Sequence, residues 1–279
     1  MKKKLVKIKQ CMEKNSETGW NQWLAGIIDG DGYLAISKDG YAYLEITMDI
    51  NDEIALSQIK RKLGGTVTPR SGSKSIRFRI KNKAGMVNCI NCINGEIRNS
   101  IRIEQFQKVC HHLQIPYIPA KPLTLDNGYT AGLFDADGTI TICVNKSSAK
   151  DSIRSGIEGK IARLCYSRDY HQLTLKITNK YKENVSIFKH LFEIGEICCD
   201  NSRKTGPIYH WYFRSYSDVF QFLQYLKKHP LRSAKKNRLF LLNLYFSLKK
   251  RKAHLADYES IQFKNWKNFC KKWFSIVEN

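Results

Sequence analysis

The sequence has no apolar run long enough to cross a membrane, and it has few acidic residues. A bilayer span needs about 18 consecutive apolar residues, and the longest candidate, Leu239 to Leu248, is broken by Asn243. Only 25 Asp and Glu oppose 47 Lys and Arg in 279 residues, which leaves a net charge of +22. An excess of this size favours a polyanionic partner. Because no membrane segment accompanies it, we expect that partner to be nucleic acid.

The cysteines and the first residues lack the pattern of an exported protein. Nine cysteines are an odd number in a long chain, whereas disulfide frameworks belong to short secreted domains with paired cysteines. Residues 1–9 are basic and hold no apolar stretch of signal-peptide length. We therefore expect a reducing interior. Cys89 and Cys92, followed by Cys110, His111 and His112, leave a zinc site as an alternative, but no second close cysteine pair supports it.

One short pattern occurs twice. Residues 23–32 read Trp-Leu-Ala-Gly-Ile-Ile-Asp-Gly-Asp-Gly, and residues 130–138 read Thr-Ala-Gly-Leu-Phe-Asp-Ala-Asp-Gly. Each copy is an apolar run that ends acid-small-acid-Gly and is followed at once by an alternating, strand-like segment. Such a repeat predicts two related halves that meet through this element. The small residues that would allow a close helix–helix contact are Gly26, Gly30, Ala131, Gly132 and Ala136.

The same order of elements is predicted after each copy. Asp39-Gly40 is a two-residue turn signal between strands 33–38 and 41–50. Gly64-Gly65 closes a helix that begins near Asn51. Further elements expected in the first half are a hairpin that turns at 70–73 and helix over 84–114. Those expected in the second half are strands near 139–145, 171–180 and 208–215, helices at 183–194 and 217–228, and more helix to the end.

This order predicts an α+β fold built from two halves. We expect a basic, mobile leader at 1–16, an N-terminal half at 17–115, a Pro-rich linker at 116–126 and a C-terminal half at 127–279. The first helix should begin near Asn21, and Asp126-Asn127 can cap the second motif helix. The second hairpin should carry a long basic loop at 146–168. That loop either reaches extra nucleic-acid backbone or is a solvated insertion.

Period-two alternation gives each sheet a buried face and a solvent-facing one. Arg77, Arg79 and Lys81 share the solvent-facing side of one strand. Cations in register repel each other unless an anion neutralises them, so contact with phosphate or bases is favoured over a merely solvated surface. The residues expected to contact nucleic acid are Tyr33, Ser37, Lys38, Tyr43, Arg70, Arg77, Arg79, Lys81, Thr139, Thr141, Asn145, Lys176, Lys180, His210, Tyr212 and Arg214.

Each copy of the motif ends in two carboxylates. Asp29 and Asp135 are the inner ones, and Asp31 and Asp137 are the outer ones. If the motif helices pack side by side, their ends lie together, and carboxylates brought close repel unless cations lie between them. Oxygen ligands suit a hard ion such as Mg²⁺, and two such ions can activate water and stabilise a leaving oxygen. We expect the outer pair to hold metal, whereas the inner pair is better explained as caps of helix ends or turns.

Residues 24–32 and 130–138 resemble the two motifs of a single-chain LAGLIDADG homing endonuclease. The order of elements after each motif also fits, so the resemblance covers nearly the whole chain. It implies a pseudo-twofold αββαββα repeat with two saddle-shaped antiparallel sheets in the major groove of a long double-stranded DNA site. It further implies a monomer that uses two or more Mg²⁺ ions to cleave both strands, leaving short 3′ overhangs.

The resemblance also implies roles for named residues. Asp31 and Asp137 would hold metal, assisted by the backbone carbonyls of Gly30 and Ala136. A polar residue that positions water is expected at the end of the second strand of each half, where this sequence has Met48 and Asn179. Asn179 can do that work, whereas the Met48 sulfur is only a weak acceptor.

A basic residue should approach each acid. Lys235 matches this position in the second half, and Arg102, with Arg98 as a neighbour, matches it in the first. Arginine can stabilise phosphate charge but cannot exchange a proton near neutral pH. The expected metal ligands are thus intact in both halves while the assisting residues differ, which puts equal cleavage of the two strands in doubt.

Two other functions stay open. Some LAGLIDADG proteins are maturases that bind intron RNA and help it splice; an intact Asp31 and Asp137 pair argues against a pure maturase, not against a dual role. A DNA-binding regulator would need an added helix-turn-helix domain, and no remaining segment is a clear one. The chain is rich in Lys, Asn and Ile, as expected from an AT-rich genome. We expect a mitochondrial or chloroplast protein that is encoded there.

Overall fold

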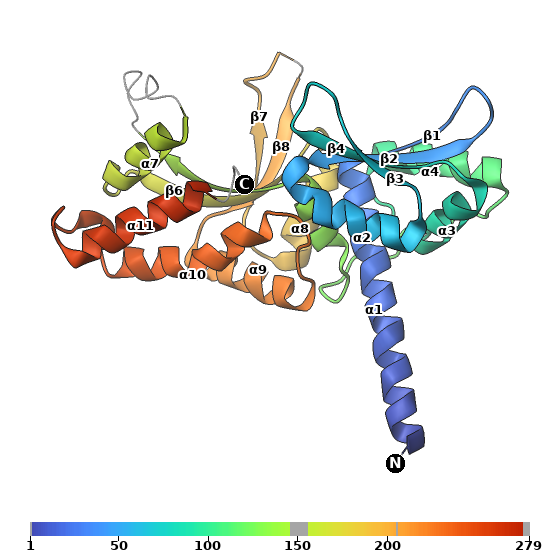
Figure 1. Ribbon diagram of the computed structural model, residues 1–279, viewed down its shortest axis with the longest axis horizontal. Helices are drawn as coiled ribbons and strands as arrows, with labels where there is room; N and C mark the ends of the chain where they lie inside the picture. Colours follow the sequence, from blue (N-terminus) through green and yellow to red (C-terminus); the bar gives the residue numbers. More distant parts are fainter. Residues whose placement is uncertain (1, 146–155, 205, 276–279) are drawn as a thin grey trace.

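The computed structural model describes residues 2–145, 156–204 and 206–275, with side chains from residue 17 onward. Two halves lie side by side, and each contains a four-stranded antiparallel sheet with helices on one face (Figure 1). The strand order is β1-β2-β4-β3 in the first half and β5-β6-β8-β7 in the second, which is the same order. The predicted α+β fold with a duplicated half is therefore confirmed. No described helix is both long and apolar enough for a membrane span.

The first half follows the predicted order. Its elements are α1 (Lys2–Asp31), β1 (Gly32–Ile36), β2 (Ala42–Asp49), the 3-10 helix η1 (Ile50–Asp52), α2 (Glu53–Leu63), β3 (Thr66–Pro69), β4 (Ser75–Ile80), α3 (Lys83–Ile93) and α4 (Ser100–Leu113). Gly40 and Gly64 both have φ of +79°, so each supplies the left-handed conformation that its turn or helix end requires. Leu44 pairs with Ile80 and Ile46 with Phe78 on the buried face of the sheet.

The second half contains two elements that the sequence did not predict. Its elements are α5 (Tyr129–Asp137), β5 (Gly138–Val144), α7 (Gly156–Tyr166), β6 (His171–Asn179), α8 (Glu183–Phe192), β7 (Glu196–Asp200), β8 (Ile208–Phe213), α9 (Tyr216–Lys228), α10 (Lys236–Lys250), the 3-10 helix η2 (Ala253–Leu255) and α11 (Ile261–Ser275). β7 is a short edge strand without a fully buried residue, so its alternation is weak. α7 occupies part of the stretch expected to be a basic loop.

The expected loop at 146–168 is thus wrong over its C-terminal part, while residues 146–155 lie outside the described residues. Leu164 and Cys165 of α7 are buried, and Trp266 of α11 donates to the Cys165 carbonyl at 3.1 Å. The Arg168 guanidinium lies 4.9 Å from the centre of the Tyr258 ring, so the end of this stretch contacts the segment that leads to α11. This segment packs because the C-terminal helices give its apolar side chains a partner.

The first helix is longer than predicted. It begins at Lys2 instead of near Asn21, so the backbone of the expected leader continues the motif helix. Figure 1 shows this part of α1 projecting away from both sheets. Residues 1–18 contain neither Pro nor Gly, and many of them are good helix formers. An apolar pattern indicates only the part of a helix that packs against other residues. It therefore missed the first residues of α1, which extend beyond the packed part.

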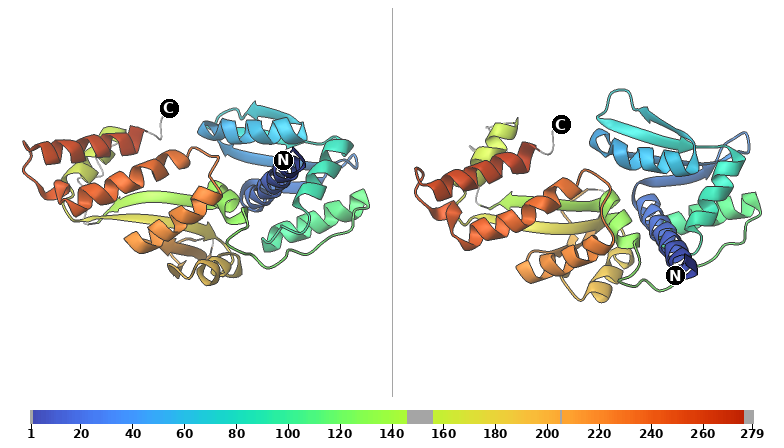
Figure 2. Two further views of the ribbon diagram at one scale, coloured as in Figure 1. Left: turned by 90° about the horizontal axis from the view of Figure 1, so that it is seen from below. Right: turned by 60° about the horizontal axis from the view of Figure 1, so that its bottom comes forward.

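The two halves meet where α1 and α5 pack at small residues. A Cβ added to Gly26 would lie 2.2 Å from the Tyr129 carbonyl oxygen, and one added to Gly132 would lie 1.9 Å from that of Trp23. No side chain fits at either distance, so the two backbones touch. Figure 2 shows the halves on opposite sides of this contact. The close helix contact predicted from the repeated motif is confirmed.

We expect Gly26→Ala to lower the free energy of unfolding by about 3 kcal/mol, because the new methyl would overlap the α5 backbone. Gly19→Ala in the same helix is the matched control. Nothing lies within 4 Å of its added Cβ, so the methyl should stabilise α1 by about 0.5–1 kcal/mol. Urea denaturation of the two variants measures both effects. Equal stabilities would show that the halves do not depend on this close approach.

Candidate active site

The ends of the motif helices bring the outer acids to one place. A Cβ on Gly30 would lie 2.4 Å from the Ala136 Cβ and 3.3 Å from Asp137 Oδ2, so the end of α1 touches the end of α5. Burial, followed by the nearby Asp137 carboxylate, raises the pKa of Asp31 to about 7. Burial also raises the pKa of Asp137 to about 6 against the opposing effect of two cations. The site therefore concentrates negative charge where water is scarce.

Two cations lie at equivalent positions beside these acids. Lys235 Nζ donates to the carbonyl oxygens of Asp135 and Ala136, both at 2.6 Å. The Arg102 guanidinium donates to the Gly30 carbonyl oxygen at 3.3 Å. These carbonyls belong to the last turns of the motif helices, whose unsatisfied oxygens favour a cation. The structure thus brings Arg102 and Lys235 together with the acid pair.

The atoms at the helix ends suit a hard divalent cation. The Asp31 and Asp137 carboxylates and the Gly30 and Ala136 carbonyls are all oxygen donors, as Mg²⁺ prefers. A cation between the buried acids would relieve the repulsion that raises the pKa of Asp31. Each carbonyl already accepts a hydrogen bond but has a second lone pair. No group of three or more His, Cys, Asp or Glu within the described ranges forms a metal site, including at the proposed zinc cysteines.

The inner acid of the second motif holds the segment that leads to Lys235. Asp135 is buried and accepts the backbone N–H groups of Arg232 at 2.8 Å and Ser233 at 3.1 Å. The Ser233 hydroxyl donates to the same carboxylate. Because Lys235 lies two residues after Ser233, this carboxylate fixes the backbone just before it. The interpretation of the inner acid as a cap holds, although it caps the turn before α10 and not the end of its own helix.

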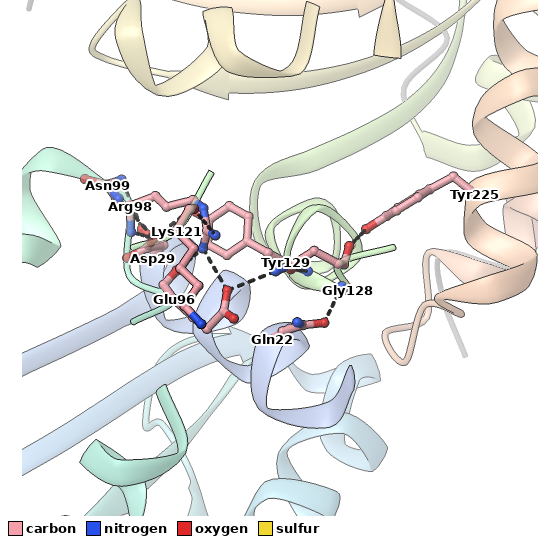
Figure 3. Close-up of polar contacts among 10 residues, drawn as sticks. Gln22, Asp29, Glu96, Arg98, Asn99, Lys121, Gly128, Tyr129 and Tyr225 are labelled. Carbon is pink, nitrogen blue, oxygen red and sulfur yellow. Dashed lines mark hydrogen bonds and ion pairs between the residues drawn. The ribbon is translucent and has the colours of Figure 1, made fainter. Parts of the chain in front are cut away.

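Asp29 holds the segment that leads to Arg102 in the same way (Figure 3). Its Oδ2 accepts the backbone N–H groups of Arg98 at 2.7 Å and Asn99 at 3.0 Å, just before α4. The Asn99 amide also donates to the Asp29 backbone carbonyl at 3.1 Å. Burial raises the pKa of Asp29 to about 6, and these donors oppose that rise. The inner acids therefore position both cations.

Each inner acid also accepts a bond from an aromatic residue of the other half. Trp23 Nε1 donates to Asp135 at 2.8 Å, and the Tyr129 hydroxyl donates to Asp29 at 2.6 Å. Each aromatic residue lies six positions before the inner acid of its own motif (29 − 23 and 135 − 129), so the bonds are related by the pseudo-twofold. The only sequence signal for them was this equal spacing, because an aromatic that donates looks like one that packs.

Met48 and Asn179 occupy equivalent places, each two residues beyond the strand partner of a motif glycine. Met48 is buried with the core face of β2. The Asn179 Oδ1 accepts from the Tyr181 backbone and from the Asn184 amide, both at 3.0 Å. This oxygen therefore holds its own loop, and the amide nitrogen is the side-chain polar atom of Asn179 that is left to contact a ligand.

A third carboxylate, from the 3-10 helix η1 that follows β2, approaches the acid pair. Asp52 is buried, and its Oδ1 accepts the Ala234 backbone N–H at 2.7 Å, across the two halves. Burial and Asp137 raise the pKa of Asp31 most, and the charge of Asp52 adds to them. The sequence gives no signal for Asp52 except the acidic strand end at 49–52. The site thus differs between the halves in its acids as well as in its cations.

The solvent-facing side of the first sheet contains its own anion. Glu45 lies beside two of the three cations predicted there, at 2.9 Å from Arg79 and 3.6 Å from Arg77. The expectation that these arginines need an external anion is therefore wrong for this pair. Strand register places Glu45 directly opposite Arg79 and diagonal to Arg77. Lys81 is exposed beyond this cluster.

The second sheet is less open than predicted at one residue. His210 is 9% exposed and shares a 2.8 Å hydrogen bond with Thr178, which leaves little of it for a ligand. Tyr212 and Lys176 are half-buried neighbours on this face, and Arg214 lies over the Tyr212 ring at 4.6 Å. The other predicted contact residues that are exposed or half-buried are Tyr33, Ser37, Lys38, Tyr43, Arg70, Thr139, Thr141, Asn145 and Lys180.

Fold and site define a single-chain protein of two pseudo-twofold halves, joined by their motif helices, with one acid from each half at the junction. Residues 130–245 match the family model described as LAGLIDADG endonuclease. The chain belongs to the LAGLIDADG family.

Named relatives point in two directions. The chain is 39% identical over 258 residues to the "Probable intron-encoded endonuclease aI2" of Debaryomyces hansenii, covering 92% of this chain and 38% of that protein. It is 40% identical over 260 residues to the "Intron-encoded RNA maturase bI4" of Saccharomyces cerevisiae, covering 93% of this chain and 37% of that one. The chain thus spans less than two fifths of the length of these two relatives.

A solved structure agrees in fold. The I-LtrWI LAGLIDADG homing endonuclease bound to target DNA matches with a TM-score of 0.61 at 16% sequence identity. The match covers 91% of this chain and 97% of that one. An identity this low supports the fold alone.

We expect Asp31→Asn to raise the free energy of unfolding of the metal-free protein near pH 8 by on the order of 2 kcal/mol. The folded pKa of about 7 lies above the ordinary 3.8. The folded state therefore binds more protons than the unfolded state between these values, and wild-type stability falls as the pH rises through this window. Near pH ~4 the folded carboxyl is neutral and the gain should vanish.

Urea unfolding with a chelator at both pH values measures this difference. Asp49→Asn, an exposed acid at the end of β2, is the matched control and should change stability little at either pH. An Asp31→Asn protein no more stable than wild type at pH 8 would contradict the crowding of charge at this site.

We expect Tyr129→Phe to lower the free energy of unfolding by about 2 kcal/mol, because it removes a donor from a buried carboxylate. Asp29 Oδ1 has no hydrogen-bond partner in the described part of the chain, so no donor on that oxygen compensates for the lost tyrosine hydroxyl. Tyr41→Phe, in the exposed β1–β2 turn, is the control. Thermal or urea unfolding gives the difference, and equal stabilities of the two variants would show that the cross-half bond contributes nothing.

Proposed function

We propose that the chain is a site-specific DNA endonuclease that hydrolyses one phosphodiester in each strand of a long duplex site and leaves short 3′ overhangs. The observation that carries this proposal is the meeting of Asp31 and Asp137 at the ends of two pseudo-twofold helices. The strands of a duplex are themselves related by twofold axes. Two acids related in the same way suit two scissile phosphates, one on each strand.

The residues of the site have different roles in this proposal. Asp31 and Asp137, with the carbonyls of Gly30 and Ala136, would hold Mg²⁺. The bound ions would supply a water of lowered pKa and charge stabilisation at phosphorus. Lys235 and Arg102 stabilise negative charge on the scissile phosphates, each from a fixed place at the end of a motif helix.

Assistance to the two strands is unequal in this proposal. The Asn179 amide can orient a water near one phosphate, whereas Met48, at the equivalent place, offers only a buried thioether. Lys235 can also pass a proton in principle, and Arg102 cannot. We therefore propose that one strand is cut faster than the other.

The partner in this proposal is double-stranded DNA, bound by a monomer. A net charge of +22 and basic residues on both sheets, among them Lys81, Lys176 and Arg214, support a polyanion along the strand faces. Phosphate contacts should dominate affinity, while the alternating side chains read base edges. We further propose an intron-encoded protein of an organellar genome, which accords with relatives named as intron-encoded.

RNA maturase activity is the second candidate function. The observation that favours it is the relative named as an RNA maturase, which aligns with 93% of this chain at 40% identity. Its test is the affinity for intron RNA, measured apart from DNA cleavage. The two functions are compatible, since an acid pair is needed for one and a basic surface for both.

We expect Asp31→Asn and Asp137→Asn each to lower double-strand cleavage of a plasmid target library by about a thousandfold. Each replacement removes one charge from the expected metal ligands and leaves the side-chain size unchanged. Asp49→Asn, on the exposed strand end, should cut like wild type. Full activity in either site variant would remove that acid from the mechanism. Absence of Mg²⁺-dependent cutting by wild type across the library would overturn the endonuclease proposal.

A further inference from the structure

The helices beneath the second sheet expose aromatic rings that the proposed endonuclease does not use. Tyr216 and Phe220 of α9 are 58% and 45% exposed, and Phe240 of α10 is 76% exposed. A groove of about 690 Å³ opens between these helices. Its lining, which we call the α9–α10 groove, consists of Tyr216, Asn243, Phe246, Ser247, Lys249 and Lys250.

This groove lies on the side of the sheet away from the solvent-facing strand surface. α9 packs through Phe222 against Trp211 and Phe213 of β8, with ring centroids 5.8 and 5.2 Å apart. These two residues alternate with Tyr212, which faces the other way. Figure 1 shows α9 and α10 together on the opposite side of the strands from the rim formed by β7 and β8. A duplex on the strand faces would leave the groove open.

The groove lies in a strongly basic segment. Residues 216–252 contain seven Lys and three Arg but one acid, Asp218. Lys249 and Lys250 line the groove, and the exposed Arg251 and Lys252 follow them. Two copies of a chain with a charge of +22 repel each other, which opposes self-association through this patch. The charge therefore favours a polyanion over a second copy.

The rings are arranged to receive flat groups. Tyr216 and Phe220 stack at 5.9 Å with an interplanar angle of 24°, and Phe246 meets Tyr216 edge-on at 4.9 Å. Phe220 and Phe246 support the Tyr216 ring from two sides, while more than half of the residue stays exposed. Exposed aromatic faces flanked by cations bind unpaired bases and the backbone between them. The bases of a duplex are already stacked on each other, so single-stranded nucleic acid fits this groove.

We propose that the α9–α10 groove binds a single-stranded segment of RNA. The exposed Asn243 and Ser247 offer hydrogen-bonding groups beside the rings, within reach of a 2′-hydroxyl or a base edge. The likeness to a protein named as an RNA maturase over 93% of this chain favours RNA over single-stranded DNA. This proposal rests on the second candidate function and gives it a site. It is independent of the endonuclease site.

The test is the affinity for a fluorescent oligo(U) RNA of about 20 nucleotides, with Mg²⁺ absent so that cleavage plays no part. Tyr216→Ala should weaken binding about tenfold, the effect of one lost stacking contact. Tyr216→Phe keeps the ring and should bind like wild type. Tyr41→Ala, an equally exposed aromatic in the β1–β2 turn, is the matched control and should leave RNA affinity unchanged.

A second pair of variants separates the groove from net charge. Lys249→Gln with Lys250→Gln should weaken RNA binding about tenfold more than Lys267→Gln with Lys271→Gln, which removes the same charge from exposed positions of α11. Equal losses in the two double variants would assign RNA binding to net charge and overturn the proposal. A Tyr216→Ala protein that binds like wild type would do the same.

Crosslinking gives the location directly. RNA containing 4-thiouridine should crosslink to peptides of α9 and α10, and crosslinks confined to the strands would overturn the proposal. Sedimentation tests the competing occupant. A concentration-dependent dimer of wild type that Tyr216→Ala abolishes, with RNA affinity unchanged, would make the groove a protein interface. The same oligo(U) made as DNA, if bound at least as tightly as the RNA, would overturn the choice of RNA.

Discussion

The contact between the backbones of α1 and α5 supports everything else at the centre of this molecule. Because Gly26 and Gly132 carry no side chain, each helix can approach the carbonyl oxygens of the other. That approach brings Trp23 and Tyr129 within hydrogen-bond distance of the inner acids across the junction. It also places Asp31 and Asp137 where their charges interact. Packing and electrostatics are therefore coupled: the tight contact stabilises the fold and imposes the repulsion that a cation could relieve.

A division of labour within each motif follows from this geometry. The outer acids face the shared site. The inner acids instead accept hydrogen bonds from a turn and from the opposite half. The inner carboxylates connect each motif helix to the segment that leads to its cation, so acid and cation belong to one hydrogen-bonded framework. The pseudo-twofold is closely kept in this framework. It is broken at Met48 and Asn179, at Arg102 and Lys235, and by Asp52, which are positions around the acid pair.

Much of the fold was readable because local signals agreed with the tertiary structure. The glycines at 40 and 64, the alternation of β2 and β4, and the repeated motif each predicted an element that the structure contains. The failures have two other causes. The helical α7, the pairing of Glu45 with arginines and the burial of His210 depend on neighbours distant in sequence or on strand register. The length of α1 instead follows from local helix propensity in residues that do not pack, which an apolar pattern does not report. Resemblance located the outer acids and both cations, but not Asp52 or the cross-half donors.

The ion pairs of Glu45 have a consequence for how the first sheet would meet a polyanion. A protein cation that neutralises a phosphate releases cations condensed on the nucleic acid, and this release is a large part of the driving force at low salt. Arg77 and Arg79 already have a carboxylate partner. Because Glu45 offsets part of their charge, the cluster neutralises fewer phosphates than two free arginines would, and it releases fewer ions. These arginines therefore contribute more to register on the ligand than to attraction, and the sheet is less adhesive toward arbitrary polyanions than its count of cations suggests.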